Sequence, residues 1–393
     1  MKKILIVNNN MKIGGVQKSL CNLLCATADQ YDITLLLFAP IGDYLPEIPQ
    51  KVHVISCDSL FRFLGVSQEE CSNSLCNYFT RGMLACFCKL FRRKTIMPLL
   101  MLSQEKLKTH YDCAISYLQN GNPHHFYGGV NEFVLEKVSA DRKIAFLHCD
   151  YMQCGANNKE NNIDYEAFDL IAACSDGCRK SFVSALPELA KKSRTVPNFH
   201  QYEKIEQQAN ENPYRYAAGQ FHVIMVSRLA HEKGIERAIL AVSHAREKNI
   251  PVVLHIIGDG PKENDLHSFS QKLGLDNAVL FHGSQKNPYR FMRNADFLMI
   301  TSLHEAAPMV IDEACALALP ILSVKTTSSD EMILKRACGW VCENEQRSLN
   351  EALVSVLNNP EQIEMIKERL RSTRFNNEKA SAAFAELCGS NYE

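Results

Sequence analysis

The first half of the chain alternates short, wholly apolar runs with segments that carry an apolar residue every three or four positions. Residues 4–7 (ILIV) form such a run, and residues 16–28 then place their apolar side chains on one helical face. Wholly apolar runs are typical of buried parallel strands, because helices cover both faces of such a sheet. The other predicted strands of this half are DITLLLF, VHVIS, YDCAISYL, KIAFLHC and DLIAAC, with an irregular helical stretch at residues 67–110.

The alternation stops in a polar stretch and then restarts. Strand-like runs FHVIMVS, VVLHIIG, AVLFHG, DFLMIT and PILSV follow, with the main helical segments at 235–246, 262–273 and 308–318. Two successive series of strands and helices predict an α/β protein with two doubly wound, Rossmann-like domains. The expected parts are an N-terminal domain (1–199), a linker (200–220), a C-terminal domain (221–375) and a C-terminal helix (376–393) that crosses back to the N-terminal domain.

Composition narrows the class of protein. The 393 residues are 46% hydrophobic and 22% charged, as in ordinary globular proteins, and the formal net charge of −1 gives no field that attracts nucleic acid. There is no run of 18 apolar residues, and MKKILIVNNN has too few apolar positions for a signal peptide, so a cytoplasmic protein is expected. The sixteen cysteines form no Cys-x-x-Cys pair and lie mostly in apolar runs, which predicts buried thiols in a reducing compartment.

Two glycines stand in the turn after the first strand, in NMKIGGVQKSL. Gly14 and Gly15 precede a helix whose N-terminal amides favour an anion, and glycine lets a ligand approach the backbone closely. A tight strand-to-helix turn explains the same pair. The segment is not Gly-x-Gly-x-x-Gly, so a dinucleotide site is not supported.

Three loops of the second half also follow predicted strands. In VSRLAHEKG, Arg228 and Lys233 provide a guanidinium fork and a point charge that suit a diphosphate, although two solvated surface cations have the same pattern. IIGDGP carries Gly258 and Gly260, which close a turn. FHGSQKNP (281–288) offers backbone that fits the edge of a planar base, or serves as a connecting loop.

Two acids stand eight positions apart in the apolar segment SLHEAAPMVIDEA. Pro308 suits the first helical position, so Glu305 lies in the preceding loop and the amides of residues 306–309 are open to an anion. Glu313 then falls inside a mostly apolar helix, where a lone acid needs a partner. The alternative is a solvated acid on a surface helix.

Five motifs, GGVQKSL, SRLAHEKG, IIGDGP, LFHGS and SLHEAAPMVIDEA, occur in this order between Gly14 and Ala314. Together they resemble the GT4 family of retaining glycosyltransferases, which have the GT-B fold. The resemblance implies two Rossmann-like domains that face each other across a cleft. It also implies that residues 1–199 form the acceptor side and that residues 221–375 bind a nucleotide sugar.

The resemblance implies specific roles in the second domain. Arg228 and Lys233 are expected to hold the diphosphate, Glu313 the ribose hydroxyls and Glu305 the hydroxyls of the transferred sugar. Gly283 is expected to lie at the edge of the base. The segment expected to line the sugar and phosphate consists of Ala307, Pro308, Met309 and Val310.

In the first domain, the resemblance implies that Gly15 approaches the diphosphate and that His148 faces the reacting sugar and the acceptor. The expected donor is a UDP- or GDP-sugar, and the expected acceptor is a saccharide or a lipid-linked saccharide of surface polysaccharide or glycolipid synthesis. No Asp-x-Asp occurs in the chain, and no metal or other obligatory cofactor is expected. Attack on the same face as the departing phosphate is implied, without a carboxylate nucleophile.

One departure from the family bears on the donor, and two other functions stay open. Ala306 stands where the family usually has glycine, and because alanine resists positive φ, this departure puts the identity of the donor in doubt. A sugar-nucleotide epimerase on a similar two-domain fold and a non-catalytic nucleotide-sugar sensor are the alternative functions.

Residues 86–108 mix phenylalanine, leucine and methionine with lysine and arginine, including Arg92, Arg93 and Lys94. Such a segment suits contact with an anionic inner leaflet, which predicts a peripheral membrane protein. Packing of two short helices on the first domain, interrupted at Pro98, is the other interpretation.

Overall fold

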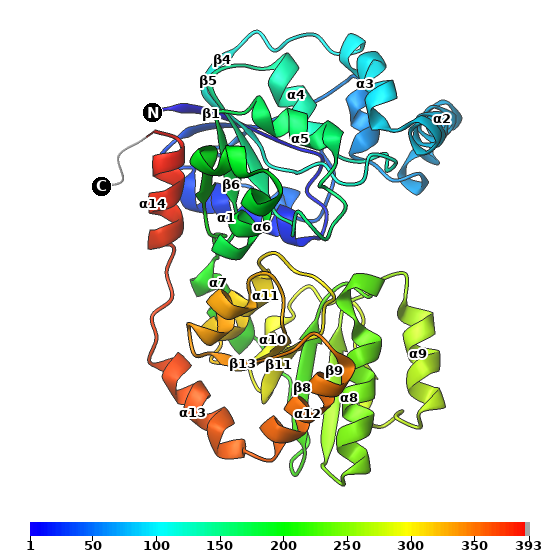
Figure 1. Ribbon diagram of the computed structural model, residues 1–393, viewed down its shortest axis with the longest axis vertical. Coiled ribbons are helices and arrows are strands. Elements are labelled where there is room, and N and C mark those ends of the chain that lie inside the picture. The colour runs from blue at the N-terminus through cyan, green and yellow to red at the C-terminus, as the bar shows by residue number, and fades with distance from the viewer. Residues whose placement is uncertain (390–393) are drawn as a thin grey trace. The chain divides into compact units, whose positions relative to one another are not determined.

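The computed structural model describes residues 1–389, and the chain forms two compact units (Figure 1). The first unit contains Met1–Phe199 and the segment that begins at Asn377. The second unit is His200–Asn376. The end of the predicted C-terminal helix, residues 390–393, lies outside the described residues.

The first unit is built on a seven-stranded parallel sheet with the order β3-β2-β1-β4-β5-β6-β7. Its strands are β1 (Lys3–Asn8), β2 (Asp32–Leu37), β3 (His53–Ser56), β4 (His110–Ser116), β5 (Ser139–Leu147), β6 (Leu170–Ala173) and β7 (Ser193–Thr195). Its α-helices are α1 (Gly15–Thr27), α2 (Leu75–Phe91), α3 (Arg93–Leu102), α4 (Val130–Lys137), α5 (Lys159–Glu166), α6 (Asp176–Ala185) and α14 (Glu378–Leu387). Short 3₁₀ turns occur at Leu45–Glu47, Leu60–Leu64, Glu69–Cys71 and Pro187–Lys192.

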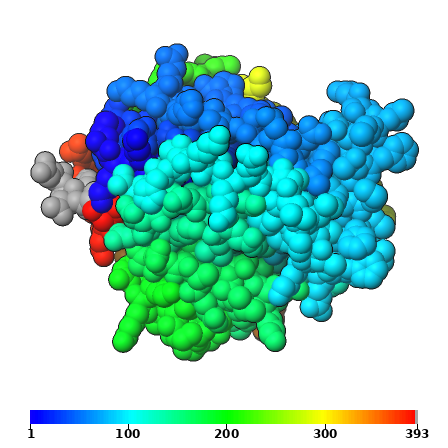
Figure 2. Space-filling model, turned by 90° about the horizontal axis from the view of Figure 1, so that it is seen from above, coloured from blue at the N-terminus to red at the C-terminus, as the bar shows by residue number. Residues whose placement is uncertain are grey.

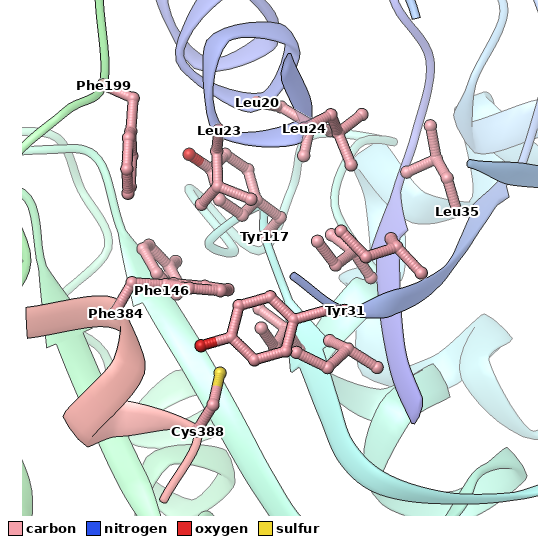
Figure 3. Close-up of a cluster of buried hydrophobic side chains, with 14 of the residues drawn as sticks. Leu20, Leu23, Leu24, Tyr31, Leu35, Tyr117, Phe146, Phe199, Phe384 and Cys388 are labelled. Carbon is pink, nitrogen blue, oxygen red and sulfur yellow. The ribbon is translucent and has the colours of Figure 1, made fainter. Parts of the chain in front are cut away.

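Helix α14 belongs to the core of the first unit although it lies at the far end of the sequence (Figure 3). Phe384 is fully buried and meets Tyr31 edge-on, with ring centroids 5.8 Å apart. At the end of the helix, Lys2 Nζ donates to the Cys388 carbonyl at 2.9 Å and Arg142 donates to the Leu387 carbonyl at 2.9 Å. Cations at the C-terminus of a helix satisfy its last carbonyls and oppose its dipole, so the docking of α14 is both apolar and electrostatic.

The second unit contains a six-stranded parallel sheet with the order β10-β9-β8-β11-β12-β13. Its strands are β8 (Phe221–Val226), β9 (Val252–Ile257), β10 (Val279–Phe281), β11 (Phe297–Ile300), β12 (Ile321–Val324) and β13 (Gly339–Cys342). Its α-helices are α7 (Tyr202–Asn210), α8 (Ile235–Glu247), α9 (Glu263–Lys272), α10 (Tyr289–Met292), α11 (Met309–Ala316), α12 (Gln346–Leu357) and α13 (Pro360–Arg371). A 3₁₀ turn, η5 (His231–Lys233), and a π-helical turn, η6 (Asp330–Leu334), complete the unit.

Both faces of this second sheet are buried, which explains why its strands read as unbroken apolar runs. On β8, Val223 belongs to the core that packs against α8 and α12, whereas Ile224 belongs to the core on the opposite face with α10 and α11. On β11, Phe297 and Leu298 divide between the same two cores. Successive side chains of a strand therefore point alternately into two separate apolar cores, rather than into one core and the solvent.

Residues 200–220, expected as a linker, lie in the second unit. Within them, residues 202–210 form α7, and Ile205 and Ala209 are buried in the core beneath α11. The two apolar residues are four positions apart, which is enough to give a short polar helix one buried face.

Within residues 1–389, none of the helices combines the length and the apolar character that a membrane-spanning helix needs. The sixteen cysteines are free thiols, and ten of them are buried.

Candidate functional site

The loops that follow β8 and β11 bring two of the predicted site residues into contact. Lys233 ends the turn η5 after β8, and Glu305 lies in the loop after β11. Nζ of Lys233 donates to Oε1 of Glu305 at 2.5 Å, and Oγ of Ser302 donates to the same oxygen at 2.7 Å. The two strands are parallel neighbours, so the loops at their carboxyl ends meet at one edge of the sheet.

Gly234 fixes the backbone beneath this pair. It has a left-handed conformation (φ 58°), and a Cβ atom there would lie 2.4 Å from the carbonyl oxygen of Thr301. The hydroxyl of Thr301 donates to the carbonyls of Lys233 and Gly234 at 3.0 and 2.8 Å. Only glycine meets both demands, so the end of β11 sets the position from which Lys233 extends.

Arg228 lies in the loop after β8, and its largely exposed guanidinium donates to Glu232 at 2.5 Å. Partial burial raises the pKa of the Glu232 carboxyl. Hydrogen bonds from its own backbone amide and from Arg228, with the charge of Lys233, outweigh this and lower the pKa below its ordinary value. Glu232 therefore stays ionised between the two predicted diphosphate-binding cations and holds Arg228 in place.

Helix α11 begins one residue later and ends earlier than the sequence predicts. Pro308 caps it in an extended conformation (ψ 119°) instead of forming the first helical residue, and Met309–Ala316 are helical. Ala318 then takes a left-handed conformation (φ 56°), which ends the predicted helix of residues 308–318. The amides of the first turn, at Met309 and Val310, have no acceptor within the helix and carry the positive end of its dipole.

The two acids of α11 have different surroundings. Asp312 accepts from Arg336 at 2.7 Å and lies 3.4 Å from the imidazole of His200. Burial raises the pKa of Asp312, but its interactions with His200 and Arg336 outweigh burial and lower the pKa to about 2. Glu313 is 3% exposed, so the helix buries the acid that the sequence singles out. Asp312 is the structural acid of this helix, and the sequence analysis did not single it out.

The loops after β9 and β10 are tied together by their glycines. The Gly258 amide donates to the Gly283 carbonyl at 2.8 Å, and both residues have positive φ, 140° and 67°. A Cβ atom on Gly258 would lie 1.9 Å from the Ser227 carbonyl oxygen, so Gly258 is required for the backbone to pass the loop that carries Arg228. At Gly283 a Cβ atom would meet nothing within 4 Å, so this glycine is required by its backbone conformation alone.

His148 follows β5 at the carboxyl edge of the first unit's sheet. Its amide donates to Oε1 of Gln119 at 3.2 Å, and its imidazole tilts over the ring of Tyr117, with centroids 4.7 Å apart. The Tyr117 hydroxyl is held in turn by Ser19 of α1 at 2.8 Å. Nε2 of His148 is buried and has no hydrogen-bond partner within residues 1–389. The imidazole also interacts with the buried thiol of Cys174, whose pKa is lowered by a hydrogen bond with Cys178 and further by His148.

Gly15 begins α1 in the same unit. It is not among the residues with positive φ in the described chain, and a Cβ atom there would meet no heavy atom within 4 Å. Gly42, in contrast, has φ 127° and would clash with the backbone of Met11. Neither backbone conformation nor packing in the first unit requires glycine at Gly15, which weakens the interpretation of GG as a tight turn.

Ala306, which replaces the usual glycine, fits its loop without strain. Five non-glycine residues of the described chain have positive φ, and Ala306 is not one of them. Its side chain is 6% exposed. Alanine therefore does not force an unfavourable backbone here, and its effect is confined to the space that its methyl group fills.

Two residues that the sequence analysis missed hold the loop after β11. Arg237 of α8 donates to the Thr301 carbonyl at 3.2 Å and to Asn344 at 2.5 Å. Asn344, after β13, donates to the carbonyls of Ser302 and Leu303 at 3.4 and 3.1 Å. No sequence motif marks Asn344. The sequence analysis also gave no role to Ser302, although its position directly after a predicted strand was a signal for one. No group of three or more histidine, cysteine or acidic side chains within residues 1–389 is arranged to hold a metal ion.

Comparison with known proteins gives this arrangement a class. Two parallel α/β units of this kind form the GT-B fold, which solved glycosyltransferase structures share over almost the whole chain. Residues 206–373 match the family model described as "Glycosyl transferases group 1". The matched segment covers less than half of the chain, lies within the second unit and contains Lys233, Glu305 and Glu313, so this part of the chain is similar to the GT4-type family.

Two curated relatives differ in how much they cover. An uncharacterized glycosyltransferase of Methanocaldococcus jannaschii is 32% identical over 43% of this chain, and the chain spans only 43% of that protein's length. The N-acetylgalactosamine-N,N'-diacetylbacillosaminyl-diphospho-undecaprenol 4-alpha-N-acetylgalactosaminyltransferase of Campylobacter jejuni is 24% identical over 82% of this chain and 80% of its own.

Among solved structures, HepE of Anabaena in complex with UDP and glucose has a TM-score of 0.68 at 20% identity. The alignment covers 99% of this chain and all of HepE. At this identity the likeness establishes the fold.

Proposed function

We propose that the protein is a retaining glycosyltransferase. It moves a sugar from a UDP- or GDP-sugar to a saccharide or lipid-linked acceptor in the synthesis of a surface polysaccharide or glycolipid. The observation that carries the proposal is the contact of Lys233 with Glu305 and Ser302, next to the loop that leads into α11. A cation and an acid at adjoining strand ends suit the two halves of a nucleotide sugar, an anionic diphosphate and a sugar rich in hydroxyls.

In this proposal the second unit binds the donor. Arg228 and Lys233 hold the diphosphate, together with the backbone of the segment Ala307, Pro308, Met309 and Val310 at the start of α11. Glu313 accepts hydrogen bonds from the ribose hydroxyls, and the loop at Gly283 borders the base. Because the diphosphate leaves with growing negative charge, cations and amides fixed in advance lower the barrier most where that charge develops.

In this proposal Glu305 contacts hydroxyls of the transferred sugar, and His148 acts toward the reacting sugar and the acceptor. As the bond between the anomeric carbon and the β-phosphate oxygen breaks, the acceptor oxygen bonds to the same face of the carbon. The proton of the acceptor hydroxyl passes to the departing phosphate. The place of His148 directly after β5 supports a role toward the sugar or the acceptor, and the open space at Gly15 supports close approach of the diphosphate.

The relatives support the choice of substrates. HepE binds UDP and glucose, which supports a UDP-sugar as donor. The Campylobacter jejuni relative acts on a diphospho-undecaprenol acceptor, as its name states, and this supports a lipid-linked acceptor. Peripheral association with the inner face of a membrane would bring the enzyme to such an acceptor.

Calorimetric titration of UDP and GDP into the wild type, Lys233→Ala and Glu313→Gln tests donor binding. We expect one of the two nucleotides to bind, and each substitution to weaken it roughly 10- to 100-fold, because each removes hydrogen bonds that involve a charged group. Lys248→Ala, an exposed cation at the end of α8, is the matched control. Equal nucleotide affinity in the wild type and all three variants would contradict the proposed nucleotide site.

Nuclear magnetic resonance of the reaction separates the activities. Transfer with retained anomeric configuration supports the proposal, and transfer with inversion contradicts the retaining mechanism. An isomerised donor in the absence of acceptor would identify an epimerase. Nucleotide binding without turnover across a broad panel of donors and acceptors, in wild type and His148→Ala alike, would identify a sensor.

A further inference from the structure

Helix α2 presents apolar side chains to the solvent along its whole length. Five of them, here called the apolar stripe, are Leu75, Phe79, Met83, Phe87 and Leu90, with exposed fractions of 75%, 69%, 66%, 43% and 66%. Their spacing of four, four, four and three residues keeps them on one side of the helix. From the first to the last they extend about 22 Å, at the rise of an α-helix.

The opposite side of α2 attaches the helix to the first unit. Leu84 and Cys88 are its buried side chains, and Leu84 packs with Phe63 and Cys71 in a small separate cluster. An ordinary surface helix buries its apolar side and exposes its polar side. Here the wider apolar side faces outward, and Figure 2 shows residues 75–102 (blue to cyan, at the right) projecting from the first unit. An outward apolar surface of this length indicates an interaction site.

The segment that carries the stripe has charge of one sign. No aspartate or glutamate occurs between Cys71 and Gln104, while the same interval carries five lysine and arginine residues. Outside this interval, Glu160 of α5 lies 3.7 Å from Arg92, whose side chain is still 59% exposed. Lys89, Arg92 and Lys94 are exposed at the end of the stripe. A second copy of the chain would bring the same positive charge, so self-association lacks charge complementarity. A surface of anionic headgroups over an apolar interior complements both features.

We propose that the apolar stripe of α2 inserts into the interface of a lipid bilayer that contains anionic lipids. Lys89, Arg92 and Lys94 then meet the headgroup phosphates. This surface differs from the predicted segment 86–108. Helix α2 ends just before Arg92, which has a positive φ of 69°, and α3 begins directly after it. Helix α3 buries Ile96, Met97, Leu100 and Met101. Pro98 lies inside α3 rather than between two helices.

Arg93 takes no part in this surface. It is 1% exposed and donates to Glu132 at 3.2 Å and Asn161 at 3.0 Å. The docking surface is thus the stripe of α2 with the three exposed cations, and it is independent of sugar transfer. Its test needs neither donor nor acceptor, so its outcome and that of the proposed function are separate.

Sedimentation with vesicles measures the interaction directly. We expect the wild type to bind vesicles of phosphatidylcholine and phosphatidylglycerol and to bind pure phosphatidylcholine much more weakly. The variant Phe79→Ser/Met83→Ser/Phe87→Ser should lose about 100-fold or more in its partition coefficient, because it removes the inserted side chains. Lys89→Ser/Lys94→Ser should lose roughly 20-fold on the anionic vesicles only, at about fivefold for each cation near the surface.

A matched control replaces three exposed apolar residues that lie outside α2, Ile163→Ser/Leu273→Ser/Met365→Ser, and should bind like the wild type. Circular dichroism and thermal melting verify that each variant is folded. Vesicle binding that survives in the α2 variant, or that is lost equally in the control, would overturn the proposal. So would absence of vesicle binding by the wild type together with a dimer, measured by sedimentation velocity, that the α2 substitutions dissociate.

Discussion

Lys233 and Glu305 form an ion pair of 2.5 Å between the loops after two neighbouring strands, 72 positions apart in the sequence. Their side chains are only 25% and 14% exposed, and Ser302 donates to the same carboxylate oxygen. The pair is electrically neutral as a unit. A phosphate that binds at Lys233 therefore competes with the carboxylate that also orients the lysine.

Glu305→Gln should separate these two effects. Glutamine keeps an oxygen for Ser302 but removes the competing charge, so UDP alone should bind about three- to tenfold more tightly, the gain from freeing a partly buried cation. Sugar transfer should nevertheless fall about 100-fold, because the proposed contact of Glu305 with the sugar hydroxyls is weakened. Calorimetry and a transfer assay measure the two quantities. Glu247→Gln, an exposed acid of α8, is the control, and unchanged binding and transfer in Glu305→Gln would contradict the assignment.

Gly234 offers a test of how the backbone positions Lys233. Gly234→Ala should lower the free energy of unfolding by about 1 kcal/mol for the left-handed backbone and by roughly 2 kcal/mol more for the contact with Thr301. Gly274→Ala is the matched control, because Gly274 has nearly the same φ, 67°, with nothing within 4 Å of the added Cβ atom. Chemical denaturation gives both values. Equal losses in the two variants would show that the contact with Thr301 is relieved by small shifts.

Most strands could be predicted from apolar runs in the sequence, because a strand buried on both faces consists of consecutive apolar residues. The strands predicted at residues 4–7 and 320–324 correspond to β1 and β12. Helix α7 was missed because it has just two buried apolar residues, Ile205 and Ala209, in a polar stretch. The docking of α14 depends on Phe384 meeting Tyr31, a long-range contact that no local pattern reveals.

The site was predictable only in part. Lys233 and Glu305 follow strands, and parallel strands that are neighbours bring such loops together. The role of Asn344 depends on the carbonyls of Ser302 and Leu303, and backbone acceptors leave no mark in the sequence. For Arg93 the sequence suggested an exposed cation, because the residue belongs to a basic cluster. The structure instead buries it against Glu132.

Arg93 should therefore contribute to stability rather than to surface charge. Arg93→Met should lower the free energy of unfolding by about 3–5 kcal/mol, because it leaves the buried partners without their cation. Burial and the neighbouring Glu132 raise the pKa of Asp164 to about 8, and Arg93 opposes that rise, so the loss should deepen above this pH. Lys94→Met, at the exposed neighbour, should change stability by less than about 0.5 kcal/mol. A small loss for Arg93→Met in chemical denaturation would contradict this role.

Three histidines of the second unit form a hydrogen-bonded ladder that should make stability depend on pH. Nε2 of His222 donates to the Ala217 carbonyl at 2.7 Å, so its Nδ1 accepts from His255 at 3.0 Å, and Nδ1 of His255 accepts from His282 at 3.0 Å. His222 and His255 each use one ring nitrogen as a donor and the other as an acceptor, so both rings are neutral in this arrangement. A proton added to Nδ1 of His255 would face the N–H group of His282 and break the ladder.

Burial, followed by the charges of His282 and His222, lowers the pKa of His255 to about 3. An unfolded histidine titrates near pH 6.5, so between pH 6.5 and 3 the unfolded chain binds a proton that the folded chain refuses. Stability is complete above about pH 6.5 and falls as the pH decreases, by about 1.4 kcal/mol per pH unit for this group. Burial lowers the pKa of His282 as well and steepens the loss.

His255→Gln keeps a donor and an acceptor but cannot take up the proton. Chemical denaturation between pH 7.5 and 5, a range above the titration of most carboxylates, should give a pH slope that is smaller by about one proton than in the wild type. The control is His244→Gln on the surface of α8, which should retain the wild-type slope. The other titratable groups that face the ladder are the hydroxyls of Tyr214 and Tyr216 and the carboxylate of Asp296. Identical slopes for His255→Gln and the wild type would mean that the ladder rearranges to accept the proton.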